Sequence, residues 1–114
     1  MSGLALALVG LVALLHLGFL MLEMAFWTRP LGLRVFGQSR EDAERSRVLA
    51  ANQGLYNGFL AAGLLYGAAT GSRAFVVFFL ACVIVAGCFG AATANRRIFV
   101  VQALPALLAL AAVA

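Results

Sequence analysis

The chain has 114 residues, of which 65% are apolar and 11% charged, and its formal net charge is +4. With a mean hydropathy of +1.06, this composition excludes an ordinary soluble domain and favours an integral membrane protein. A helical span needs about 20 apolar residues, so four spans would use nearly the whole length. The positive charge does not indicate nucleic-acid binding, because we expect the arginines at span ends, beside membrane lipid head groups.

Four predicted spans form a single transmembrane domain over residues 1–114, at about 3–28, 48–70, 74–95 and 98–114. The first lacks the basic leading segment of a signal peptide and its apolar stretch is too long for one, so we interpret it as a retained span. Arg29-Pro30 should end it, because the residue before a proline avoids the helical region. Pro105 should kink the last span. The predicted fold is an all-α integral membrane four-helix bundle.

The charged connection 29–47 should lie on the cytoplasmic side. We expect its apolar part, residues 31–36, to lie in the membrane interface rather than in free solution. Ser39 is followed three residues later by the acid Asp42, which is the pattern of a capping box and predicts a helix start. This charged helix should continue without a break into the second span at Val48.

The distribution of arginines predicts the orientation. The second connection holds only Arg73, whereas the first and third connections hold all the others: Arg29, Arg34, Arg40, Arg45, Arg47, Arg96 and Arg97. By the positive-inside rule, the first and third connections face the cytoplasm and both termini lie on the extracytoplasmic side.

Small residues recur every four positions in the second and third spans. Such stripes let membrane helices approach closely, within one chain or between two copies in a homodimer. The two sets are Ala50, Gly54, Gly58 and Ala62, and then Ala86, Gly90 and Ala94. Cys82 and Cys88 point about 120° apart on one helix, so we expect neither a disulfide nor a metal site there.

Glu23 is the most informative residue of the first span. A carboxylate at that depth costs on the order of 2.5–3.5 kcal/mol on the translocon scale, so it usually has a partner or a function. His16, Glu23 and Trp27 share one stripe of the helix, because steps of seven and eleven residues return to within about 20°.

The second span carries four hydrogen-bonding side chains within two turns. Measured from the arginines at the span ends, Glu23 and Gln53 both lie about 9 Å deep. We therefore predict a polar pocket in the cytoplasmic half of the bundle, with His16 at its floor and Gln102 closing it from the last span. Its walls would be Glu23, Trp27, Asn52, Gln53, Tyr56 and Asn57.

A structural interpretation stands beside this one. Amide and phenol groups often hold membrane helices together, at about 0.6 kcal/mol each. Trp27 is also typical of the interfacial aromatic belt, and a buried His16 is often a satisfied hydrogen bonder. Glu23 is harder to explain in this way, because an amide would serve without the ionisation cost.

Two sequence blocks carry a resemblance to a known family. The stretch LHLGFLMLEMAFW at 15–27, followed by VFG and by VLAANQGLYNGFLAAGLL at 48–65, resembles the bacterial membrane proteins called domain of unknown function 1304. The resemblance covers nearly the whole chain. It implies a small multi-pass protein of the bacterial inner membrane and no defined activity. The shared polar positions fall on His16, Glu23, Trp27, Asn52, Gln53, Tyr56 and Asn57.

Three functions fit these residues. The first is binding or transport of a small amphipathic or cationic ligand, proton-coupled through Glu23, with Trp27 and Tyr56 as aromatic walls. In size, span number and its first-helix glutamate the chain is similar to small multidrug-resistance transporters, whose motifs it lacks. The second is a membrane enzyme of isomerase or hydratase type with Glu23 and His16 as acid and base, about 10 Å apart along the axis. The third is an accessory subunit. No cofactor or metal motif is present.

Overall fold

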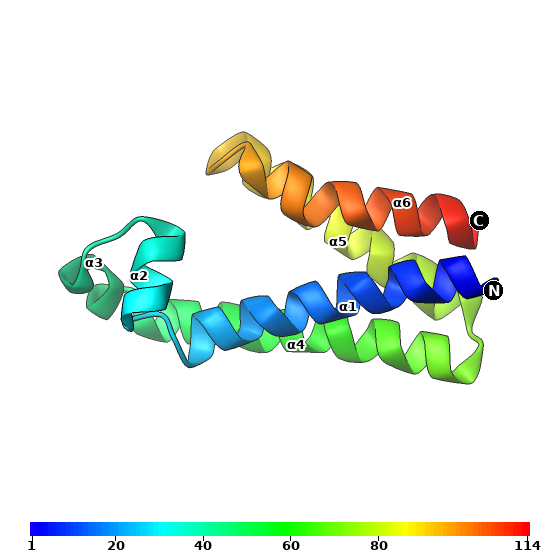
Figure 1. Cartoon of the computed structure of the whole chain (residues 1–114), viewed down its shortest axis with the longest axis horizontal. Helices are drawn as coiled ribbons and strands as arrows, with labels where there is room; N and C mark the ends of the chain where they lie inside the picture. Colours follow the sequence, from blue (N-terminus) through cyan, green and yellow to red (C-terminus); the bar gives the residue numbers. More distant parts are fainter. The chain divides into compact units, whose positions relative to one another are not determined.

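The computed structural model describes all 114 residues and contains helices and no strands. This confirms the predicted all-α class. In chain order the elements are α1 (Gly3–Met24), α2 (Pro30–Phe36), α3 (Arg40–Arg45), α4 (Arg47–Thr70), α5 (Arg73–Thr93), the π-helical segment η1 (Phe99–Ala103) and α6 (Leu104–Val113) (Figure 1). The chain forms two compact units, one of Met1–Leu15 with Leu60–Ala114 and one of His16–Phe59.

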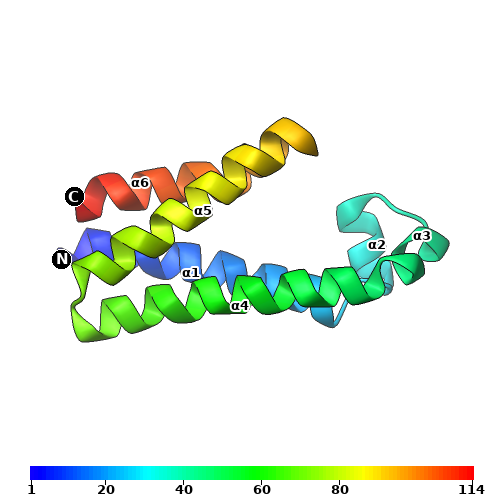
Figure 2. The same cartoon turned by 180° about the vertical axis from the view of Figure 1, so that it is seen from behind.

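The first unit is built around an apolar core of small and branched side chains. Its fully buried members include Val9 and Val12 from α1, Leu64 from α4 and Leu80 from α5. α4 turns back into α5 at Gly71, whose φ of 67° is the left-handed conformation that glycine adopts without strain (Figure 2).

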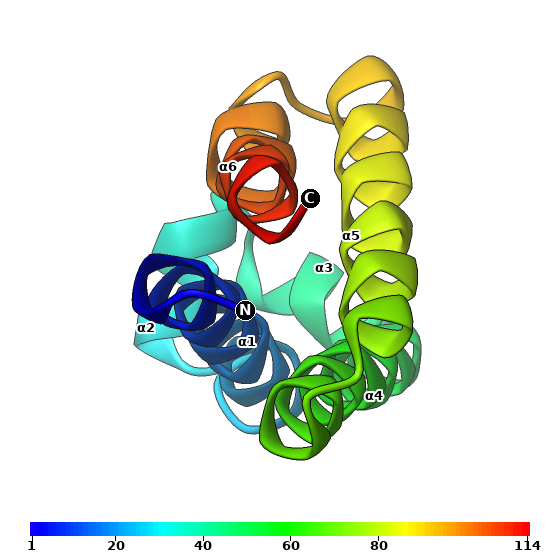
Figure 3. The ribbon, with the colours of Figure 1, turned by 90° about the vertical axis from the view of Figure 1, so that its right-hand side faces the viewer.

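η1 and α6 return alongside α5 in the same unit, and both pack against it (Figure 3). Gly87 permits this approach, because a Cβ at that position would lie 2.8 Å from the backbone nitrogen of Ala103. Pro105 stands in the first turn of α6, directly after the π-helical segment. A proline offers no N–H to the carbonyl four residues earlier, and the wider π turn accommodates this loss.

The second unit pairs the end of α1 with the start of α4, and α2 and α3 lie at the end of this helix pair (Figure 1). Ser39 Oγ accepts a hydrogen bond from the backbone N–H of Asp42 at 3.1 Å, which confirms the predicted helix start. Gly37, with φ of 62°, ends α2 in the left-handed cap that glycine favours.

Three helix boundaries in this unit differ from the sequence expectation. α1 ends at Met24 rather than near residue 28. The segment after it, for which the sequence predicted no helix boundaries, is the helix α2, because Pro30 is favourable in a first helical turn, where its missing N–H costs nothing. α3 and α4 are separate helices, since Ser46 departs from helical geometry at φ −102° and ψ 8°.

Two helices are long and apolar enough to cross a membrane, Gly3–Met24 and Arg73–Thr93, and a shorter apolar helical stretch runs over Phe99–Val113. α4 is not among them, because polar side chains interrupt its apolar sequence. By length and composition, therefore, two of the helices could span a bilayer.

Candidate functional site

Glu23 and Asn57 meet between α1 and α4 in the second unit. The Nδ2 amide of Asn57 donates a hydrogen bond to Glu23 Oε1, and both side chains are half-buried. The structure thus brings together two residues of the predicted pocket that are 34 positions apart in the chain.

Two glycines of α4 allow the helices to approach this closely. A Cβ at Gly54 would lie 2.5 Å from Met24 Cγ and 3.2 Å from the carbonyl oxygen of Leu20, and one at Gly58 would lie 2.8 Å from Leu20 Cδ1. Asn57 lies between these glycines in sequence. Because the backbones are so close, its short side chain spans the distance to the carboxylate.

Glu23 is the only acidic side chain without a basic partner. The other three all pair with arginines of α3 or of the start of α4, in the exposed ion pairs Arg45–Glu41, Arg45–Asp42 and Arg47–Glu44. Glu23 Oε2 accepts no hydrogen bond and is not buried, so it remains accessible. The site is therefore a carboxylate held by one amide, with its charge uncompensated by the protein.

Trp27 holds α3 in place. Its indole Nε1–H donates to the carbonyl oxygen of Ala43 and to Ser46 Oγ, both at 3.1 Å, and its ring packs against Phe36 with centroids 4.8 Å apart. These contacts anchor α2 and α3 and give Trp27 a structural role that the sequence could not reveal, since its partners lie in short helices that follow the first span.

The remaining amide and phenol groups of the predicted pocket are exposed on α4. Gln53 lies one turn from Asn57 on the same helical face. Asn52 and Tyr56 share another face, about 140° and 100° away from Asn57 respectively, and Tyr56 contacts Phe59 edge-on with ring centroids 5.8 Å apart. The structure therefore leaves Gln53 beside the Glu23–Asn57 pair and directs Asn52 and Tyr56 outward.

His16 is fully buried and packs edge-on against Phe19, with ring centroids 5.1 Å apart. Seven helical residues separate it from Glu23, a distance of about 10 Å along the axis, so the two side chains do not form one acid–base pair. Gln102 lies in η1, within the first unit. No three His, Cys, Asp or Glu side chains are grouped as metal ligands.

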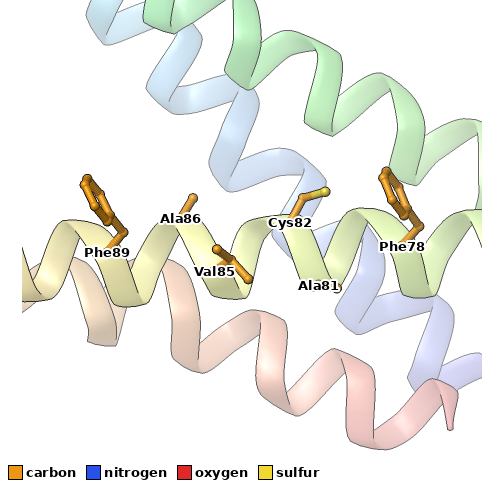
Figure 4. Close-up of a pocket in the computed structure, with 6 residues that line it drawn as sticks. All are labelled: Phe78, Ala81, Cys82, Val85, Ala86 and Phe89. Atoms are coloured by element: carbon orange, nitrogen blue, oxygen red, sulfur yellow. The ribbon is translucent and has the colours of Figure 1, made fainter.

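An open apolar groove also runs along α5 in the first unit (Figure 4). It is lined by Phe78, Ala81, Cys82, Val85, Ala86 and Phe89, all from this one helix. Cys82 and Cys88 are free thiols, and no disulfide is present. Because the groove offers no charged or hydrogen-bonding side chain apart from the thiol of Cys82, its surface suits contact with an apolar surround.

Comparison with known proteins gives two matches. A family model described as "Protein of unknown function (DUF1304)" matches residues 10–114. The chain is also similar to the uncharacterized protein YpaA of Lactococcus lactis subsp. lactis (strain IL1403), at 35% identity over 104 residues that cover 88% of this chain and 87% of YpaA. No solved structure matches the chain. Neither description names a ligand, a reaction or a partner.

Proposed function

This chain belongs to the DUF1304 family of proteins of unknown function, and we propose that it is a small membrane protein that binds a cationic, amphipathic ligand at Glu23. One observation carries the proposal: Glu23 accepts a hydrogen bond from Asn57 and has no basic partner, whereas every other acidic side chain has one.

A carboxylate removed from bulk water needs hydrogen bonds and an opposite charge to offset its lost hydration. The amide of Asn57 supplies one hydrogen bond and no charge. A proton or a bound cation supplies the rest. Glu23 would therefore hold a proton when the site is empty and exchange it for the ligand cation, which is the coupling step of a proton-linked transporter.

The proposal includes a membrane location with four spans and both termini on the extracytoplasmic side. Two helices of spanning length and a third apolar stretch support it. So does the arginine distribution, in which Arg73, the first residue of α5, is the only arginine near the connection between α4 and α5. α4 would be the least apolar span, with Asn57 at the ligand site. Alternating access would require a second copy, packed through small-residue helix faces.

A direct test measures binding of hexylammonium to the purified protein in a non-ionic detergent at neutral pH, by titration calorimetry. We expect the wild type to bind it and Glu23→Gln to lose at least about tenfold in affinity, because the glutamine cannot carry the charge that attracts the cation. The neutral analogue hexanol should bind both proteins equally weakly.

Glu44→Gln is the matched control, because it removes the same charge from an exposed ion pair with Arg47. This variant should bind hexylammonium like the wild type. Equal hexylammonium affinity in the wild type and Glu23→Gln would overturn the proposal, since binding would then reflect partition into the micelle or an unspecific surface effect.

A further inference from the structure

We infer that the ligand of the Glu23 site is a protonated primary or secondary amine, bound through its N–H groups, and not a quaternary ammonium. This inference rests on the proposed function, because it names the ligand class of the same site. It follows from which atoms of the Glu23–Asn57 pair are engaged and which are open.

The hydrogen bond between the two residues orients the amide, because Asn57 Nδ2 donates to Glu23 Oε1. This orientation suits the cation-bound state, in which Glu23 is ionised and its oxygens only accept. The amide oxygen, Asn57 Oδ1, is then left as an acceptor. Neither it nor Glu23 Oε2 has a protein donor, and neither is a buried atom. The pair thus presents two open hydrogen-bond acceptors, Glu23 Oε2 and Asn57 Oδ1, to a ligand.

Gln53 adds to this acceptor set. It lies one helical turn from Asn57 on the same face of α4, and its side-chain amide has no hydrogen-bond partner in the protein. A primary ammonium carries three N–H donors. A carboxylate oxygen and two amide oxygens therefore match its donors in number, and charge-assisted hydrogen bonds of this kind are among the strongest.

The site lacks the feature that recognises quaternary ammonium groups, which is a cage of aromatic faces. The ring of Trp27 is packed against Phe36 and its N–H is bonded to α3. Tyr56 is 53% exposed and contacts Phe59 on another face of α4. A cation without N–H donors would meet the charge of Glu23 and leave the open acceptors unpaired.

The test compares two cations of equal charge and similar chain, hexylammonium and hexyltrimethylammonium, by titration calorimetry on the full-length protein in non-ionic detergent. We expect the wild type to bind hexylammonium about tenfold or more tightly than hexyltrimethylammonium, because only the former donates hydrogen bonds. Equal affinities, or tighter binding of the quaternary cation, would overturn the inference. This comparison uses only the wild-type protein, so it tests the inference even if a substitution prevents folding.

Asn57→Leu supplies a second readout, because leucine has a similar volume and no acceptor. The preference for hexylammonium should fall to roughly threefold or less in this variant, and it should persist in Asn52→Leu, the matched change on another face of α4. A preference unchanged in folded Asn57→Leu would also overturn the inference. If the wild type binds both cations with equal affinity and Glu23→Gln binds neither, the proposed cation site is supported, and only the inference that the ligand is a primary or secondary amine fails. If the binding of neither cation depends on Glu23, both the proposed function and this inference fail.

Discussion

Glu23 and Asn57 are joined by one hydrogen bond across two helices, and the charge of the carboxylate has no counterpart within the second unit or beyond it. Active and binding sites commonly keep such groups at a cost in stability, because the ligand supplies the missing interaction. The stability of a charge-neutral variant therefore distinguishes a functional carboxylate from a structural one.

We expect Glu23→Gln to unfold in detergent at the same temperature as the wild type or a higher one. The glutamine keeps an oxygen that accepts from Asn57 and removes the charge that burial disfavours. Thermal unfolding followed by circular dichroism measures this. A destabilisation of about 3–5 kcal/mol would instead indicate that Glu23 belongs to a buried ion pair.

Trp27→Phe should lower the free energy of unfolding by about 1 kcal/mol. The phenyl ring keeps the contact with Phe36 but leaves the Ala43 carbonyl without the indole donor. Hydrogen exchange should show faster exchange of the α3 amides while α5 is unchanged. Tyr66→Phe is the control, since the Tyr66 hydroxyl has no hydrogen bond in the protein, and an equal loss there would contradict the assigned role of Trp27.

At the scale of the helices, glycines mark the positions where α4 and α1 approach each other closely. Gly54 faces α1, and an added Cβ would meet Met24, Glu23 and Leu20 within 3.2 Å, whereas one at Gly18 in α1 would meet nothing within 4 Å. The same substitution should therefore have opposite effects at these two positions.

Gly54→Ala should destabilise the protein by about 1–3 kcal/mol, because α4 must move away from α1 to admit the methyl group. It should also weaken hexylammonium binding, since the Asn57 amide moves with the helix. Gly18→Ala, the control, should be neutral or stabilising by about 0.5–1 kcal/mol through helix propensity. Denaturant unfolding in mixed micelles measures both, and equal effects would contradict the close approach at Gly54.

The helix α2 depends on a second close approach of this kind. A Cβ at Gly32 would lie 1.9 Å from the carbonyl oxygen of Phe26, a backbone atom that cannot rotate away. Gly32→Ala should thus displace α2 and disturb the packing of Phe36 on Trp27. Because Trp27 is the only tryptophan, a shift in its fluorescence emission reports the displacement. An unchanged spectrum in Gly32→Ala would argue against the packing of α2 described above.

For the whole molecule, the proposed topology rests on the arginine distribution. Charge in short loops orients a membrane protein, and residues 29–47 contain eight of the twelve charged residues of the chain. In the proposed topology, the exposed apolar side chains of α5, such as Phe78 and Phe89, would contact lipid or a second copy.

Single cysteines introduced at Ser2, Glu44 and Ala114 test this topology, after Cys82 and Cys88 are replaced by alanine. In intact bacterial cells a membrane-impermeant maleimide should label the cysteines at Ser2 and Ala114, because the proposed topology places both termini outside the cytoplasm. The cysteine at Glu44 should react only after the cells are permeabilised. Labelling of the cysteine at position 44 in intact cells would contradict the predicted orientation.

The sequence by itself determined the helical class and the helix start at Ser39, and it singled out Glu23 as a costly residue in an apolar run. These features are local or depend only on composition. Long apolar runs favour helices, and a serine side chain caps a helix by accepting a hydrogen bond from the backbone N–H three residues later. A carboxylate within such a run is costly wherever its neighbours lie. The polar residues near Asn57 on α4 were also evident as a group.

Only the tertiary structure decided which of those polar groups meets the carboxylate. The phase of α4 against α1 is set by the glycine contacts at Gly54 and Gly58, and this phase points Asn57 at Glu23 and leaves Asn52 outside. The role of Trp27 likewise depends on α3, a helix distant from it in sequence. Such contacts arise from the packing of two backbones, and no pattern within one segment encodes the partner on another.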